Sequence, residues 1–135
     1  MELSYLLFAG SLSGLVSILS HSVVWSAVEL AQRRPQGTHS LQVQISEAFF
    51  HMMLGVTLGL LFWLSWGFAA LVQVPWWVRG LSFAGVAALL FAPALLNMLA
   101  SGRLAARLLM VFASRWLTTC LLAGLACAWS WEKTP

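Results

Sequence analysis

The chain contains no aspartate, and its 135 residues include only 4 acidic and 7 basic side chains. Charged residues make up 8% of the sequence, against roughly 25% in soluble domains. Hydrophobic residues account for 61%, and the mean hydropathy is +0.87. This composition excludes an ordinary soluble globular domain and predicts an integral membrane protein.

The sequence also lacks the short motifs of the common catalytic and cofactor sites. It has no Cys-x-x-Cys, no His-x-x-x-His, no Gly-x-Ser-x-Gly and no glycine-rich phosphate loop. The two cysteines, Cys120 and Cys127, lie about 10 Å apart along one hydrophobic segment and cannot bond to each other within a helix. They are expected to be apolar filler, as are Met52 and Met53.

Four long hydrophobic segments are present instead. The longest stretch without an acidic or basic residue runs from Ala48 to Val78, and about 20 apolar residues already cross the hydrocarbon core of a bilayer. The first segment lacks the basic start of a cleavable signal peptide, so we expect it to be retained. We therefore predict an all-α integral membrane protein with four transmembrane helices in an antiparallel bundle with short loops. It forms one domain, 1–135, with helices at about 3–30, 46–74, 80–100 and 108–131.

Local signals predict where some of these helices begin, end or bend. Ser46 can cap the second helix, which would place Glu47 in its first turn, near the positive end of the helix dipole. Pro75 is expected to stop the same helix. Pro93 in the third segment frees the carbonyl of Leu89, so a kink is predicted there.

Glycines predict how the first two helices pack. Gly10 and Gly14 share a helical face in the first segment, and Gly55 and Gly59 repeat the spacing in the second. Small residues four positions apart let two helix backbones approach closely. We expect these two faces to meet, which would place His21 opposite His51 at similar depth.

The scarce polar residues of the segments are predicted to form one layer near one membrane surface. Glu47 and His51 lie one turn apart on the same helical face. Counted at 1.5 Å per residue, four residues lie within roughly 5 to 15 Å of the same interface, namely His21, His51, Asn97 and Arg115. The predicted intramembrane cluster comprises His21, Glu47, His51, Asn97 and Arg115.

Each member of this cluster also has a structural interpretation. Arg115 either snorkels to lipid phosphates or pairs with Glu47 or Glu29, and Glu29 can simply end the first helix among headgroups. The histidines suit hydrogen-bonded packing positions, since neutral imidazole is the least costly ionisable side chain to bury. Asn97 suits a bond between helices or the gap left by Pro93.

Basic residues predict the orientation. Loops one and three carry four arginines, Arg33, Arg34, Arg103 and Arg107, whereas the opposite side carries Arg79 and Lys133. The positive-inside rule therefore predicts that loops one and three are cytoplasmic and that both termini lie outside the cytoplasm. Most aromatic belt residues gather toward the outer interface, namely Tyr5, Trp63, Trp66, Trp76, Trp77, Trp129 and Trp131. The arginines orient helices and give no indication of nucleic-acid binding. The size and the arginine-rich loops favour a bacterial inner membrane.

Three functional classes are compatible with this pattern. The first, which the glycine faces favour, is a helical subunit that forms a homo-oligomer or joins a larger membrane complex, with the polar layer providing specificity. The second is a small-solute or proton-coupled transporter or channel protomer, in which Glu47, His51 and Arg115 line a half-membrane cavity. The third is a membrane-embedded enzyme or cofactor protein, in which His21 and His51 ligate a haem, or His21, Glu47 and His51 hold a divalent metal. Without the motifs of known catalytic sites, we expect no cofactor and do not favour an enzyme.

Overall fold

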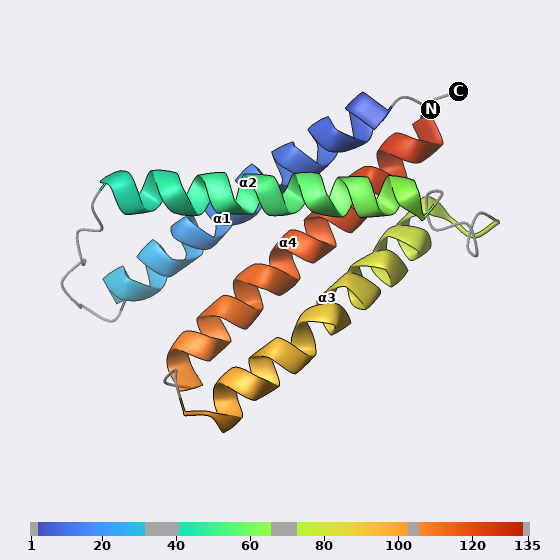
Figure 1. Ribbon diagram of the computed structural model, residues 1–135. Coiled ribbons are helices and arrows are strands. Elements are labelled where there is room, and N and C mark those ends of the chain that lie inside the picture. The colour runs from blue at the N-terminus through green and yellow to red at the C-terminus, as the bar shows by residue number, and fades with distance from the viewer. Residues whose placement is uncertain (1–2, 32–40, 66–72, 103–105, 134–135) are drawn as a thin grey trace.

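The structure, a computed structural model, describes residues 3–31, 41–65, 73–102 and 106–133. They form four α-helices, α1 Leu3–Ala31, α2 Leu41–Leu64, α3 Trp76–Ala100 and α4 Ala106–Lys133, and no strand occurs in the described residues. Each helix contains a segment of 21 to 25 residues that is long and apolar enough to cross a membrane. The predicted all-α architecture with four such helices is confirmed (Figure 1).

The second helix differs from the prediction at both ends. It begins at Leu41, so Ser46 lies inside the helix and does not cap it, and Glu47 lies beyond the first turn. No glycine or proline occurs between Leu41 and Ser46, so nothing in this stretch opposes helix formation. The helix ends at Leu64 rather than at residue 74. Residues 66–72, on which part of the prediction falls, lie outside the described residues.

Proline and glycine set the limits of α3. Pro75 does not terminate α2 but precedes α3, where its carbonyl oxygen accepts hydrogen bonds from the amides of Val78 and Arg79 at 3.0 and 3.2 Å. The helix continues unbroken through Pro93. After its C-terminus, Gly102 adopts a left-handed backbone conformation (φ 62°), which glycine accommodates without steric cost. Its amide donates to the carbonyl of Leu99 at 3.2 Å.

The helices form two hairpins joined by α4. α1 packs along α2, α3 packs along α4, and α4 also contacts α1 and α2 (Figure 1). Among the described residues, the backbones of α2 and α3 come close at almost no point, and Phe62 of α2 meets Phe83 of α3 through their side chains. α2 and α3 lie close together near the chain segment that connects them, and they diverge toward their other ends (Figure 1). Consecutive helices run in opposite directions, so α2 and α4 point the same way.

Glycines produce the tightest helix contacts. A Cβ atom added to Gly10 would overlap the carbonyl oxygen of Gly55, and one added to Gly14 would overlap that of His51. Gly59 lies against the carbonyl of Leu6 in the same contact. The two glycine faces thus meet, and backbone touches backbone where any larger residue would separate the helices.

The apolar core fills the half of the bundle in which the two termini lie (Figure 1). Phe62 of α2 is fully buried, with its ring edge-on to Phe83 of α3 at 4.9 Å and to Trp131 of α4 at 6.0 Å between centroids. Other core members are Leu6, Leu58, Ala84, Ala87, Cys120, Ala123, Cys127 and Ala128. The opposite half, where α2 and α3 diverge, contains the Glu47–Arg115 ion pair and both described histidines.

Candidate functional site

An ion pair joins α2 to α4 in the open half of the bundle. Arg115 donates from one terminal guanidinium nitrogen to a carboxylate oxygen of Glu47 at 3.1 Å. Arg115 is 20% exposed and Glu47 42% exposed, so the pair lies at the edge of the packed interior. Of the partners expected for Arg115, the structure pairs it with Glu47, and the side chain of Glu29 lies outside the described residues.

One turn further along the same two helices, a buried hydroxyl connects three helices. Thr119 of α4 lies 3.1 Å from Nδ1 of His51 on α2 and 2.8 Å from the hydroxyl of Ser17 on α1. Thr119 also donates to the carbonyl oxygen of Arg115 at 3.0 Å. His51, Ser17 and Thr119 are all buried, so this three-helix junction is a satisfied polar network inside the bundle.

His21 and His51, predicted to lie opposite each other at similar depth, share no hydrogen bond within the described residues. Each is linked to a hydroxyl on α4 instead, His51 to Thr119 and His21 to Ser114 at 3.0 Å from its Nε2. Ser114 donates to the carbonyl of Val111 at 2.9 Å, which leaves its oxygen to accept from His21. The reason is the arrangement of the bundle, in which α4 packs against both α1 and α2.

The metal hypothesis named His21, Glu47 and His51. Within the described part of the chain, no three His, Cys, Asp or Glu side chains lie close enough together to hold a metal ion. One ring nitrogen of each histidine is engaged by a hydroxyl group of α4. Four of the five cluster residues form hydrogen-bonded links between helices, namely His21, Glu47, His51 and Arg115.

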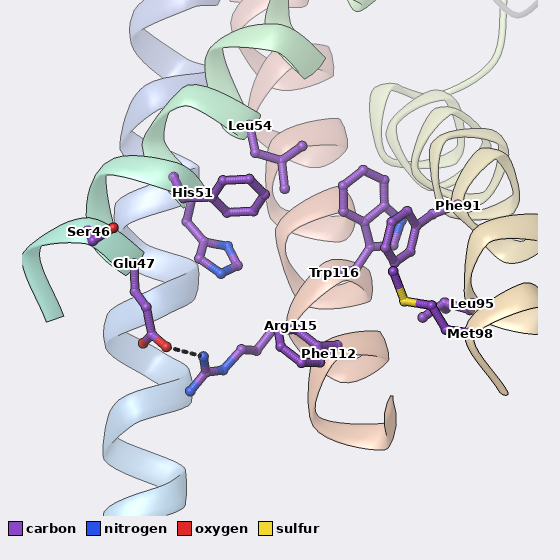
Figure 2. A pocket seen from close by; sticks show the side chains of 11 residues that line it. Ser46, Glu47, His51, Leu54, Phe91, Leu95, Met98, Phe112, Arg115 and Trp116 are labelled. Carbon is purple, nitrogen blue, oxygen red and sulfur yellow. Dashed lines mark hydrogen bonds and ion pairs between the residues drawn. The ribbon is translucent and has the colours of Figure 1, made fainter. Parts of the chain in front are cut away.

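A cavity of about 460 Å³ opens between the diverging ends of α2 and α3, with α4 as its floor (Figure 2). Glu47 and His51 reach it from α2 and Arg115 from α4, so three of the predicted cluster residues line one cavity. The remaining wall is almost entirely apolar and includes Ser46, Phe50, Leu54, Phe91, Leu95, Met98, Phe112 and Trp116. The site combines a small polar group at one side with an aromatic and aliphatic wall.

Two side-chain donors at this cavity have no acceptor. Nε of Arg115 and the indole Nε1 of Trp116 are buried and make no hydrogen bond within the described residues. A buried donor left unpaired typically costs about 1–3 kcal/mol. Trp116 stacks on Phe91 with ring centroids 4.5 Å apart, which fixes its indole against the α3 side of the cavity. A bound molecule that carries hydrogen-bond acceptors could pair with these donors.

Some predicted residues lie apart from this site. Asn97 is exposed on α3, and its side chain makes no hydrogen bond within the described residues. Cys120 and Cys127 are buried free thiols in the core. Met52 and Met53 lie on α2 outside the cavity wall.

Sequence reasoning missed the hydroxyl residues and the α3–α4 contact. Ser114 and Thr119 were not singled out, because serine and threonine are ordinary residues on helix surfaces and only the bundle arrangement places them against histidines. A Cβ on Gly80 would lie 2.9 Å from the carbonyl oxygen of Gly124. The spacing of Gly80 and Ala84 is the same small-residue signal that was used for the first hairpin, so this contact could have been found.

Three comparisons bear on the identity of the chain. No protein-family model, no curated protein and no solved structure matches it.

Proposed function

We propose that this chain is a multi-pass protein of the bacterial inner membrane that binds a small solute dissolved in the bilayer. The observation that carries the proposal is the cavity between α2 and α3, where Glu47, His51 and Arg115 interrupt an otherwise apolar wall. A volume of about 460 Å³ falls within the roughly 300–1,000 Å³ of small-molecule sites. Ionisable residues within membrane-spanning segments are costly and usually functional.

The cavity would lie in the cytoplasmic half of the membrane. It is lined by the first half of α2, the second half of α3 and the first half of α4, which adjoin loops one and three. The basic residues of those loops favour their cytoplasmic location, with both termini on the other side. A solute would enter laterally, from the inner leaflet, between the diverging ends of α2 and α3 (Figure 1).

One copy of the chain supports binding better than conduction. Phe62, Phe83 and their neighbours fill the other half of the bundle, so the cavity is closed at its inner end. Movement of the solute or of a proton across the whole membrane would require a second chain or a rearrangement of the core. Binding, with exchange at one leaflet, is therefore the function that the geometry supports best.

Replacing Leu95 by Trp tests the proposal, because Leu95 lines the cavity and a larger side chain there would fill it. The neighbouring Leu96→Trp is the matched control, since Leu96 is 64% exposed and lies outside the cavity wall. Native mass spectrometry of the purified proteins should detect a retained small molecule in the wild type and in Leu96→Trp, but not in Leu95→Trp. Equal occupancy in all three proteins would overturn the proposal.

A second candidate, a subunit of a homo-oligomer or larger complex, rests on the position of α3. Among the described helices, α3 packs substantially on α4 alone, and a Cβ added to Gly85 on its exposed side would meet nothing. A second helix could approach closely there. Gly85→Leu should then reduce the oligomer measured by cross-linking in native membranes. An unchanged or monomeric distribution would leave the solute-binding function as the better proposal.

A further inference from the structure

We infer that the occupant of the cavity between α2 and α3 is a neutral, planar, lipid-soluble molecule of the quinone class. Its ring would lie between the aromatic side chains, and its carbonyl oxygens would face Arg115 and Trp116. The inference rests on the proposed function, because it specifies the head group of the solute that this cavity binds. Charge, hydrogen-bonding capacity and wall composition each support it.

The charge of the site favours a neutral head group. Glu47 and Arg115 form an ion pair at 3.1 Å, so the polar side of the cavity carries no net charge from these two residues. An anionic head group would find Arg115 already paired and would lie beside the Glu47 carboxylate. A cationic head group would find Glu47 already paired and would lie beside the positively charged guanidinium of Arg115. Either charge would also have to leave water for an almost wholly apolar cavity.

The unpaired donors favour a molecule with carbonyl acceptors. Nε of Arg115 and Nε1 of Trp116 belong to adjacent residues of α4, line the same cavity and have no acceptor within the described residues. Carbonyl oxygens accept hydrogen bonds and carry no full charge, so they would satisfy these donors while preserving the Glu47–Arg115 pair. Both nitrogens are buried, so a ligand oxygen would reach them only when the side chains turn toward the cavity.

The hydroxyl network gives His51 a complementary role. Thr119 donates its hydroxyl hydrogen to the Arg115 carbonyl, so its oxygen accepts from both Ser17 and His51. This assignment places the hydrogen of the neutral imidazole on Nδ1 and leaves Nε2 as an acceptor at the cavity. Nε2 can accept from the hydroxyl of a reduced ring, so both redox forms of the head group would find partners.

The walls favour a planar ring with an apolar tail. Trp116 stacks on Phe91, and the rings of Phe50 and Phe112 also border the cavity. Aromatic walls bind planar rings by stacking and edge contacts. Leu54, Leu95 and Met98 provide the aliphatic surface (Figure 2). Because α2 and α3 diverge at this end of the bundle (Figure 1), a tail would pass between them into the lipid.

The test compares three probes with alkyl chains of nearly equal length and different heads: decylubiquinone, decanol and decanoate. Each is titrated onto the full chain in phosphatidylcholine nanodiscs, with equilibrium binding measured. We expect saturable binding of decylubiquinone, at least about tenfold tighter than that of either other probe. Trp116→Phe keeps an aromatic wall and removes one donor, so it should weaken decylubiquinone binding about tenfold. Trp129→Phe, at a 51% exposed position outside this cavity, should leave binding unchanged.

The possible results separate the two proposals. Stronger binding of decanoate or decanol than of the quinone, abolished by Leu95→Trp, would overturn the quinone inference and retain the proposed solute site. Quinone binding that is equal in the wild type and in Trp116→Phe would overturn the assigned hydrogen bonding and with it the inference. If no probe binds and the purified wild type retains no small molecule, both proposals fail.

Discussion

Glu47 of α2 pairs with Arg115 of α4, and the two residues are separated by 68 positions in the chain. The next contact along the two helices, His51 with Thr119, has the same separation of 68. A constant separation is what two neighbouring helices that run in the same direction produce when residues one turn apart on each face the other. The Glu47–Arg115 and His51–Thr119 contacts therefore follow one register between α2 and α4.

The ion pair can be tested by a double-mutant cycle. Glu47→Gln and Arg115→Met should each lower the free energy of unfolding, and the double variant should lose less than the sum of the two. We expect a coupling of roughly 1–3 kcal/mol, below the value for a fully buried pair, because both side chains are partly exposed. Unfolding in mixed micelles measures it, with the exposed Glu132→Gln as control. Additive losses would mean that Arg115 interacts chiefly with lipid headgroups.

The hydroxyl group of Thr119 should contribute more to the stability of the bundle than the shape of the side chain does. Thr119→Val leaves His51 and Ser17 without their shared partner and should destabilise the bundle by about 2–3 kcal/mol, whereas Thr119→Ser should retain most of the stability. Thr118→Val is the matched control, since Thr118 bonds only to the carbonyl of Ser114 on its own helix. Equal unfolding free energies for Thr119→Val and Thr118→Val would show that the junction contributes little.

Two glycine-to-alanine changes should shift the stability of the bundle in opposite directions. Gly14→Ala would force a Cβ into the carbonyl of His51 and should destabilise the bundle by about 2–3 kcal/mol. Gly85→Ala meets open space within a helix and should stabilise it by roughly 0.5–1 kcal/mol, because alanine favours helix more than glycine does. Thermal unfolding in detergent reports both. A neutral Gly14→Ala would contradict the close approach of α1 and α2.

The orientation is testable by cysteine labelling in cells. A cysteine at position 36, in place of Gln36, should react with a membrane-impermeant reagent only after the cytoplasmic side is exposed. A cysteine in place of Thr134 should react from the outside. The native thiols, Cys120 and Cys127, are buried and provide a low background. The reverse pattern would move the cavity to the outer half of the membrane.

The sequence was sufficient to predict four helices, because charge-free runs of this length have few alternatives. It also gave Glu47 as a possible partner of Arg115, since charged residues are rare enough for their pairing to be considered. The start of α2 was predicted too late because Ser46 is a good capping residue, yet Leu41 to Ile45 contain nothing that prevents helix. A capping signal marks a permitted start and does not exclude an earlier one.

The transporter alternative included a cavity lined by Glu47, His51 and Arg115, but the position of the cavity between α2 and α3 and its apolar wall depend on which helices remain apart. The order of the bundle, with α4 between the first hairpin and α3, arises from small-residue contacts such as Gly80 with Gly124. The sequence alone did not determine that order. The partners of His21 and His51 followed from the same arrangement, and their hydroxyl groups have no distinctive sequence pattern.

The equal spacing of the two α2–α4 contacts also restricts sliding between these helices. If α2 moved by one turn along α4, His51 would face Arg115 and Glu47 would face Val111, so a carboxylate and a guanidinium would both lose their partner at once. Shear motions of packed helices proceed in small steps that keep side-chain contacts. The two contacts therefore oppose sliding of α2 along α4. The cavity would instead open by tilting of α3, which packs substantially on α4 alone.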